Sequence, residues 1–151
     1  MKKQTNIEEH PTMKMNKRLT YIIFTSVLLL FGFTATAQVT VGGSVYGGGN
    51  EAMVGGSCSV LIDQDGALIE TDVYGGGALA MVNTTDGTNP TTGKTTSVTL
   101  TQGTVNGSVY GGGLGKTTPE NVPANVFGPV QVTVNGGKAG SVYGCNNVNN
   151  R

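Results

Sequence analysis

A short phrase, VYG, occurs four times in this chain and constrains its fold more than any other feature. The copies begin at Val45, Val73, Val109 and Val142, and the last reads VYGC where the others read VYGGG. Their tyrosines are separated by 28, 36 and 33 residues. Self-similarity at such a period is typical of architectures in which each unit buries its apolar face against the next.

The segments upstream of the repeated phrase have the pattern of short strands. In residues 98–101 (VTLT) and 130–134 (VQVTV), apolar residues alternate with polar ones, as in half-buried strands. No segment after residue 37 has a helical period, and the Gly-Gly pairs are expected to supply positive φ at corners. We therefore predict an all-β fold, a β-solenoid or parallel β-helix built from VYGGG repeats. An antiparallel β-sandwich is the alternative.

The first 37 residues have the layout of a secretory signal peptide with extra N-terminal residues. Basic residues at 14–18 precede an apolar run at 21–33, and Ala35-Thr36-Ala37 forms a cleavage site before Gln38. This run of 13 residues is shorter than the roughly 20 that span a bilayer. Cleavage between Ala37 and Gln38 would release a mature chain, residues 38–151, that does not span a membrane.

The composition of residues 38–151 excludes several classes of function. This part holds 24 of the 25 glycines, no histidine or tryptophan, and seven acidic residues against four basic ones. A weakly acidic chain has no electrostatic reason to bind nucleic acid. Without histidine, no Ser-His or Cys-His pair is available as nucleophile and base. We expect no catalytic activity and no cofactor.

The repeated tyrosines are the candidate ligand-binding residues. Valine and tyrosine are adjacent in each copy, so in a strand they point to opposite faces. If the valines face the core, the tyrosines form an outer ladder that could stack on sugar rings. The alternative is that the rings pack on one another and cover the glycines. The four residues are Tyr46, Tyr74, Tyr110 and Tyr143.

The acidic residues support two weaker hypotheses. Asp63-Gln64-Asp65-Gly66 resembles part of a calcium loop but lacks the full ligand set, so a solvated turn is preferred and no metal site is expected. Glu70 and Asp72 would share one face of an extended strand, the arrangement of a glycosidase carboxylate pair, but the basic residues are scattered.

Two loops interrupt the repeats, and each of two repeats holds one cysteine. Residues 83–96 and 116–129 are rich in turn residues, and we predict that they form loops on the surface. In repeat proteins, the face that carries such loops is often the face that binds a partner. Cys58 and Cys145 lie in different repeats. Their distance in sequence leaves a disulfide and two free thiols both open.

With these phrases in hand, residues 39–147 resemble the glycine-rich VYGGG-repeat proteins exported by gut anaerobic bacteria. Those surface proteins are themselves similar to the β-helical passengers of autotransporter adhesins. The resemblance implies a β-solenoid that is secreted or displayed on the outer surface of a Gram-negative cell, and it supplies no catalytic residues. This chain departs from the family in its short length and its final VYGCNN.

These observations predict a secreted or cell-surface structural, adhesin-like repeat module. Its partners would be surface glycans or proteins of the host or other cell surfaces, with end-to-end self-association through open strand edges. One alternative is a carbohydrate-binding or carbohydrate-acting β-helix module. The other is a gene fragment, truncated at the C-terminus, without independent function.

Overall fold

The computed structural model describes residues 38–148 and shows an all-β protein in which no described residue is helical. The signal peptide hypothesis for residues 1–37 lies outside the described residues. No helix in the described part is long and apolar enough to cross a membrane. The strands are β1 (Thr40–Val41), β2 (Val45–Tyr46), β3 (Cys58–Ile62), β4 (Leu68–Ile69), β5 (Val73–Tyr74), β6 (Thr96–Leu100), β7 (Thr104–Tyr110), β8 (Val130–Val134) and β9 (Lys138–Tyr143).

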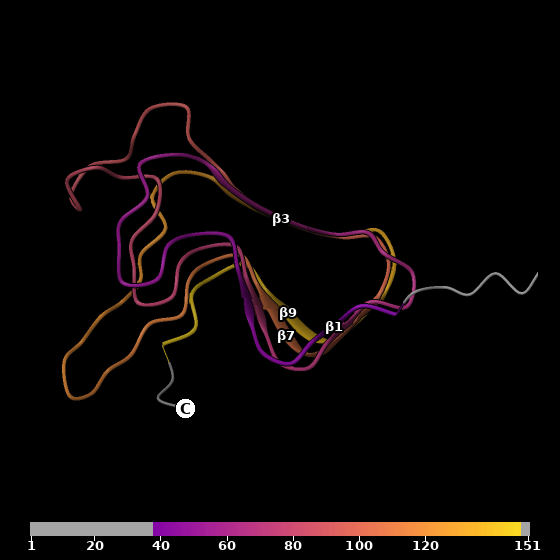
Figure 1. Ribbon diagram of the computed structural model, residues 1–151. Coiled ribbons are helices and arrows are strands. Elements are labelled where there is room, and N and C mark those ends of the chain that lie inside the picture. The colour runs from indigo at the N-terminus through magenta and orange to yellow at the C-terminus, as the bar shows by residue number, and fades with distance from the viewer. Residues whose placement is uncertain (1–37, 149–151) are drawn as a thin grey trace, which may run out of the picture. The chain divides into compact units, whose positions relative to one another are not determined.

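The strands form two sheets, and the strands within each sheet pair in parallel (Figure 1). In the six-stranded sheet, β1 and β2 pair with β4 and β5, which both pair with β7, and β7 pairs with β9. The three-stranded sheet has the order β3-β6-β8. The chain thus passes four times along the first sheet, and we call residues 39–62, 63–100, 101–134 and 135–148 the first to fourth passes. Single parallel bridges join successive passes between the two sheets: Asn50, Ala78, Leu114 and Asn147 form one column, and Val54, Val82 and Val126 another.

The pairing contradicts the antiparallel β-sandwich. Every pair of named strands is parallel, and within the described residues the one antiparallel bridge joins Lys116 to Val122 inside a loop. No two strands that are consecutive in sequence pair with each other, so the named strands form no hairpin. Parallel neighbours need a connection of a dozen or more residues, and the spacing of the repeats supplies it.

The repeated phrases align residue for residue. Val45 pairs with Val73, Val73 with Val109, and Val109 with Val142, and the tyrosines follow the same register. Within the pairing of β7 with β9, the register shifts by one residue between Val105 and Ser108. Identical residues therefore lie on top of one another in neighbouring passes.

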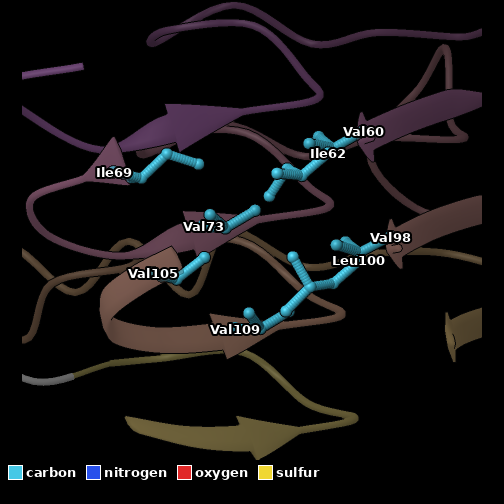
Figure 2. Close-up of a cluster of buried hydrophobic side chains, with 8 residues drawn as sticks. All are labelled: Val60, Ile62, Ile69, Val73, Val98, Leu100, Val105 and Val109. Atoms are coloured by element: carbon cyan, nitrogen blue, oxygen red, sulfur yellow. The ribbon is translucent and has the colours of Figure 1, made fainter. Parts of the chain in front are cut away.

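The core lies between the two sheets (Figure 2). The predicted inward face of Val98 and Leu100 is confirmed, because both side chains are fully buried. Val73 and Val109 are buried as expected, whereas Val142 is 46% exposed because no described strand lies beyond β9. Burying such aliphatic side chains is the main stabilising contribution. The cluster consists of Val60, Ile62, Ile69, Val73, Val98, Leu100, Val105 and Val109.

The glycines of VYGGG have a role different from the predicted one. Among the described residues, positive φ occurs at glycines outside the repeated phrase, including Gly103 and Gly137 in the turns that lead back to the six-stranded sheet. The glycines after the tyrosines are required by close stacking instead. A Cβ on Gly75 would lie 2.6 Å from the carbonyl oxygen of Gly111 in the next pass.

The two predicted loops are partly buried. Asn83, Thr84 and Thr96 are fully buried, so the edges of the first loop pack inside rather than on the surface. At its exposed tip, the Asp86 carboxylate accepts hydrogen bonds from the backbone N–H groups of Thr88 and Asn89, each 2.8 Å long. The hydrogen bond from the Asn89 side chain, 2.9 Å long, and these two backbone bonds hold the pKa of Asp86 well below its usual range.

The two cysteines are free. Cys58 is buried and Cys145 is exposed. Of the two possibilities that the sequence left open, the structure has the free thiols. Burial raises the pKa of the Cys58 thiol.

Candidate functional site

The four tyrosines of the repeats form one continuous stack. Neighbouring ring centroids are 5.0 Å apart along the whole stack. The planes of Tyr46 and Tyr74 differ by 5°, those of Tyr74 and Tyr110 by 6°, and those of Tyr110 and Tyr143 by 15°. The parallel register produces this arrangement, because equivalent residues of successive passes lie directly opposite each other.

The stack leaves few ring faces for a ligand. Tyr74 is 2% exposed, and both of its faces are covered by the neighbouring rings. Tyr143, at the end of the stack, is 44% exposed. A sugar that stacks on an aromatic face would therefore find one only at the ends of the ladder. Ligand binding by the four tyrosines stays a prediction, and their geometry favours the alternative in which the rings pack on one another.

The buried Tyr74 hydroxyl belongs to a polar network. It donates to Asp72 Oδ2 at 3.2 Å and accepts from Asn147 Nδ2 at 3.0 Å. Asp72 Oδ1 accepts the backbone N–H of Ser108 at 2.7 Å. Burial raises the pKa of Tyr74 well above its usual range, so this hydroxyl remains protonated and keeps its donor.

A groove lies beside this network. It is bordered by the six-stranded sheet and by the column of bridges that contains Ala78 and Leu114. Its volume of about 630 Å³ lies in the range of small-molecule sites. All four passes contribute to its lining: Ser44, Asn50, Thr71, Asp72, Tyr74, Ala78, Leu79, Leu114, Gly115, Lys116, Thr118 and Asn147. The groove therefore exists only when the passes are stacked.

The lining combines apolar and polar groups. Ala78, Leu79 and Leu114 are half-buried aliphatic residues, and Asp72 and Lys116 carry opposite charges. Between the first and second passes, the hydroxyls of Ser44 and Thr71 are 2.8 Å apart. Such a surface can bind a ligand through several hydrogen bonds and an apolar contact, and the lining itself carries no large net charge.

The other acidic residues do not gather around the groove. Asp63 accepts a 3.3 Å hydrogen bond from Gln102, and Asp65 lies in the exposed turn before β4. Glu70 and Asp72 lie between β4 and β5, so they are not on one strand face as the sequence suggested. Within residues 38–148, no group of three or more histidine, cysteine or acidic residues could hold a metal ion.

No motif in the sequence predicts the groove, although two signals point to its lining residues. The residue before each Val-Tyr pair is serine in three copies and Asp72 in the other, so Asp72 departs from its own repeat. The fourth residue after each tyrosine is Asn50, Ala78, Leu114 or Asn147, and these four line the groove. Comparing equivalent positions across copies would have identified both sets.

Comparison of the chain with family models, with curated proteins and with solved structures gave no significant match.

Proposed function

We propose that residues 38–151 form a β-solenoid that acts as an exported, surface-displayed structural repeat module of adhesin-like character, without catalytic activity. The observation that carries this proposal is the in-register parallel stacking of the repeated phrase over four passes. Each pass has too little apolar surface to fold alone, and stacking supplies a continuous narrow core. The stacked tyrosines and the exposed tip of the first loop fit a scaffold that presents a surface.

The chemistry of the chain supports the absence of catalysis in this proposal. The groove holds one carboxylate and one ammonium group, and both oxygens of Asp72 already accept protein hydrogen bonds. General acid–base catalysis needs a pair of groups with pKa values set apart near the working pH. The Tyr74 pKa is shifted away from that range.

Export is the part of the proposal that rests on the sequence. The test is to express the full chain in a Gram-negative host, determine the N-terminus of the product by mass spectrometry, and expose intact cells to protease. We expect a product that begins at Gln38 and a fraction that protease removes from intact cells. A product that keeps its first 37 residues and stays with the cytosolic fraction would contradict the proposal.

A further inference from the structure

The groove beside the tyrosine stack has a lining that indicates one class of ligand. We infer that it binds a neutral oligosaccharide in an extended conformation along the four passes. This inference rests on the proposed function, because it names the class of partner that the surface-displayed scaffold would bind. It differs from the sugar-stacking hypothesis, since the contacts come from the groove and not from the tyrosine faces.

The shape of the groove favours a chain-like ligand. Its lining residues come from all four passes, from Ser44 and Asn50 in the first to Asn147 in the fourth. Strands of a sheet lie about 4.8 Å apart, so four passes extend over about 14 Å. A linear ligand would therefore contact equivalent positions of several repeats, whereas a compact ligand would contact one or two.

Two side-chain hydroxyls at one end of the groove leave a donor free for a ligand. Ser44 and Thr71 share a single 2.8 Å hydrogen bond, in which one hydroxyl donates to the other. Each hydroxyl has one proton, so the second proton remains available. The carboxylate of Asp72 accepts one protein hydrogen bond at each oxygen and has lone pairs left over. A ligand rich in hydroxyl groups, which both donate and accept, matches this combination.

The floor of the groove favours a saccharide over a peptide strand as the ligand. Its backbone N–H groups are used between passes: Glu51 donates to Ala78, Leu79 to Leu114, and Gly115 to Asn147, at 2.7–2.9 Å. A peptide that binds by strand addition needs an open row of such groups. The half-buried aliphatic side chains of Leu79 and Leu114 instead suit the C–H face of a sugar ring. Because the groove holds one charge of each sign, a strongly charged ligand gains little.

The test uses the full chain, isotopically labelled, and follows its backbone amide resonances during titration. The probes are the hexasaccharides of cellulose, starch, xylan, mannan and chitin at millimolar concentration, with a synthetic VTVNG peptide alongside. We expect at least one hexasaccharide to shift groove resonances in a saturable way. A response to none of them, shifts confined to the Tyr143 end of the stack, or shifts from the peptide alone would overturn the inference.

Matched variants assign the binding to the groove. The variant Asn50→Ala/Thr71→Val removes two exposed polar groups, and we expect affinity to fall about tenfold, as for the loss of one or two neutral hydrogen bonds. Ser44→Ala is a second groove variant, expected to weaken binding about threefold. Gln131→Ala, on the outer face of β8, is the control and should bind like the unaltered chain. Groove variants that all bind like the unaltered chain would refute the assignment.

The two proposals fail differently. Far-ultraviolet circular dichroism of the same samples shows whether the β structure is present. A folded chain that binds none of the hexasaccharides would defeat the groove inference and leave the scaffold intact. A chain without a cooperative β transition would defeat both.

Discussion

The glycine that follows each repeated tyrosine offers the sharpest test of how the passes stack. In the second pass, a Cβ on Gly75 would lie 2.6 Å from the carbonyl oxygen of Gly111 and 2.9 Å from side-chain carbons of Thr96 and Val98. In the fourth pass, a Cβ on Gly144 would meet nothing within 4 Å. The two glycines are equivalent in the repeat, so they form a matched pair.

The expected magnitudes follow from these distances. Overpacking a well-packed core costs about 1–3 kcal/mol, and the nearest atom to Gly75 belongs to backbone that is held by inter-pass hydrogen bonds. We therefore expect Gly75→Ala to lower the free energy of unfolding by about 3 kcal/mol. Gly144 lies outside the positive-φ region, so Gly144→Ala should be neutral or stabilise by about 0.4–1 kcal/mol through the unfolded chain.

The assay is urea unfolding of the full chain and both variants, followed by circular dichroism. The midpoint should fall clearly for Gly75→Ala and stay the same or rise for Gly144→Ala, with equal slopes. Similar losses in the two variants would mean that the glycines act through backbone conformation. That result would refute the stacking argument.

Three further predictions test other parts of the structure. Tyr74→Phe removes a buried hydroxyl with two partners and should cost about 1–2 kcal/mol in thermal or urea unfolding, whereas Tyr143→Phe should change stability by less than about 0.5 kcal/mol. The folded-state pKa of Asp86 is depressed, so its contribution to stability is present above its unfolded pKa of about 4 and is lost as pH falls through the folded-state pKa. The variant Asp86→Asn should therefore flatten the profile of stability against pH in the acid range. An unchanged profile would contradict this prediction. Leu100→Ala should cost about 2–5 kcal/mol because the side chain is fully buried, against less than about 0.5 kcal/mol for Leu61→Ala, which is 65% exposed; equal effects would show that the core is placed wrongly.

The alternation of apolar and polar residues predicted which side chains of a strand face the core. The alternation in residues 98–101 correctly assigned Val98 and Leu100 to the core, since side chains of a strand alternate between its faces. The repetition of Val-Tyr also predicted that like residues would meet. The all-β class follows from the sequence, whereas parallel pairing was the preferred of two arrangements that the sequence left open.

The role of the glycines could not be read from the sequence in the same way. A glycine that is needed for positive φ and one that is needed for close backbone approach look identical in sequence. In the structure, Gly103 and Gly137 have positive φ in turns, while Gly75 lies against the next pass. Only the stacking distance between passes separates the two cases.

The groove depends on contacts between passes, which a single repeat does not contain. Asn147 donates to the hydroxyl of Tyr74, a residue 73 positions earlier and two passes away. Leu79, which lines the floor, has a φ of 52°, a conformation that its residue type does not suggest. Long-range geometry therefore creates the candidate site from residues that occupy equivalent repeat positions but differ in type.

The central claim is that equivalent residues of the repeats stack in parallel register, and ring-to-ring nuclear Overhauser effects test it most directly. In the full chain with labelled tyrosine, the ring protons of Tyr74 should show cross-peaks to the rings of both Tyr46 and Tyr110, because each centroid lies 5.0 Å away. A Tyr74 ring with contacts to neither tyrosine would contradict the stacked register and the fold built on it.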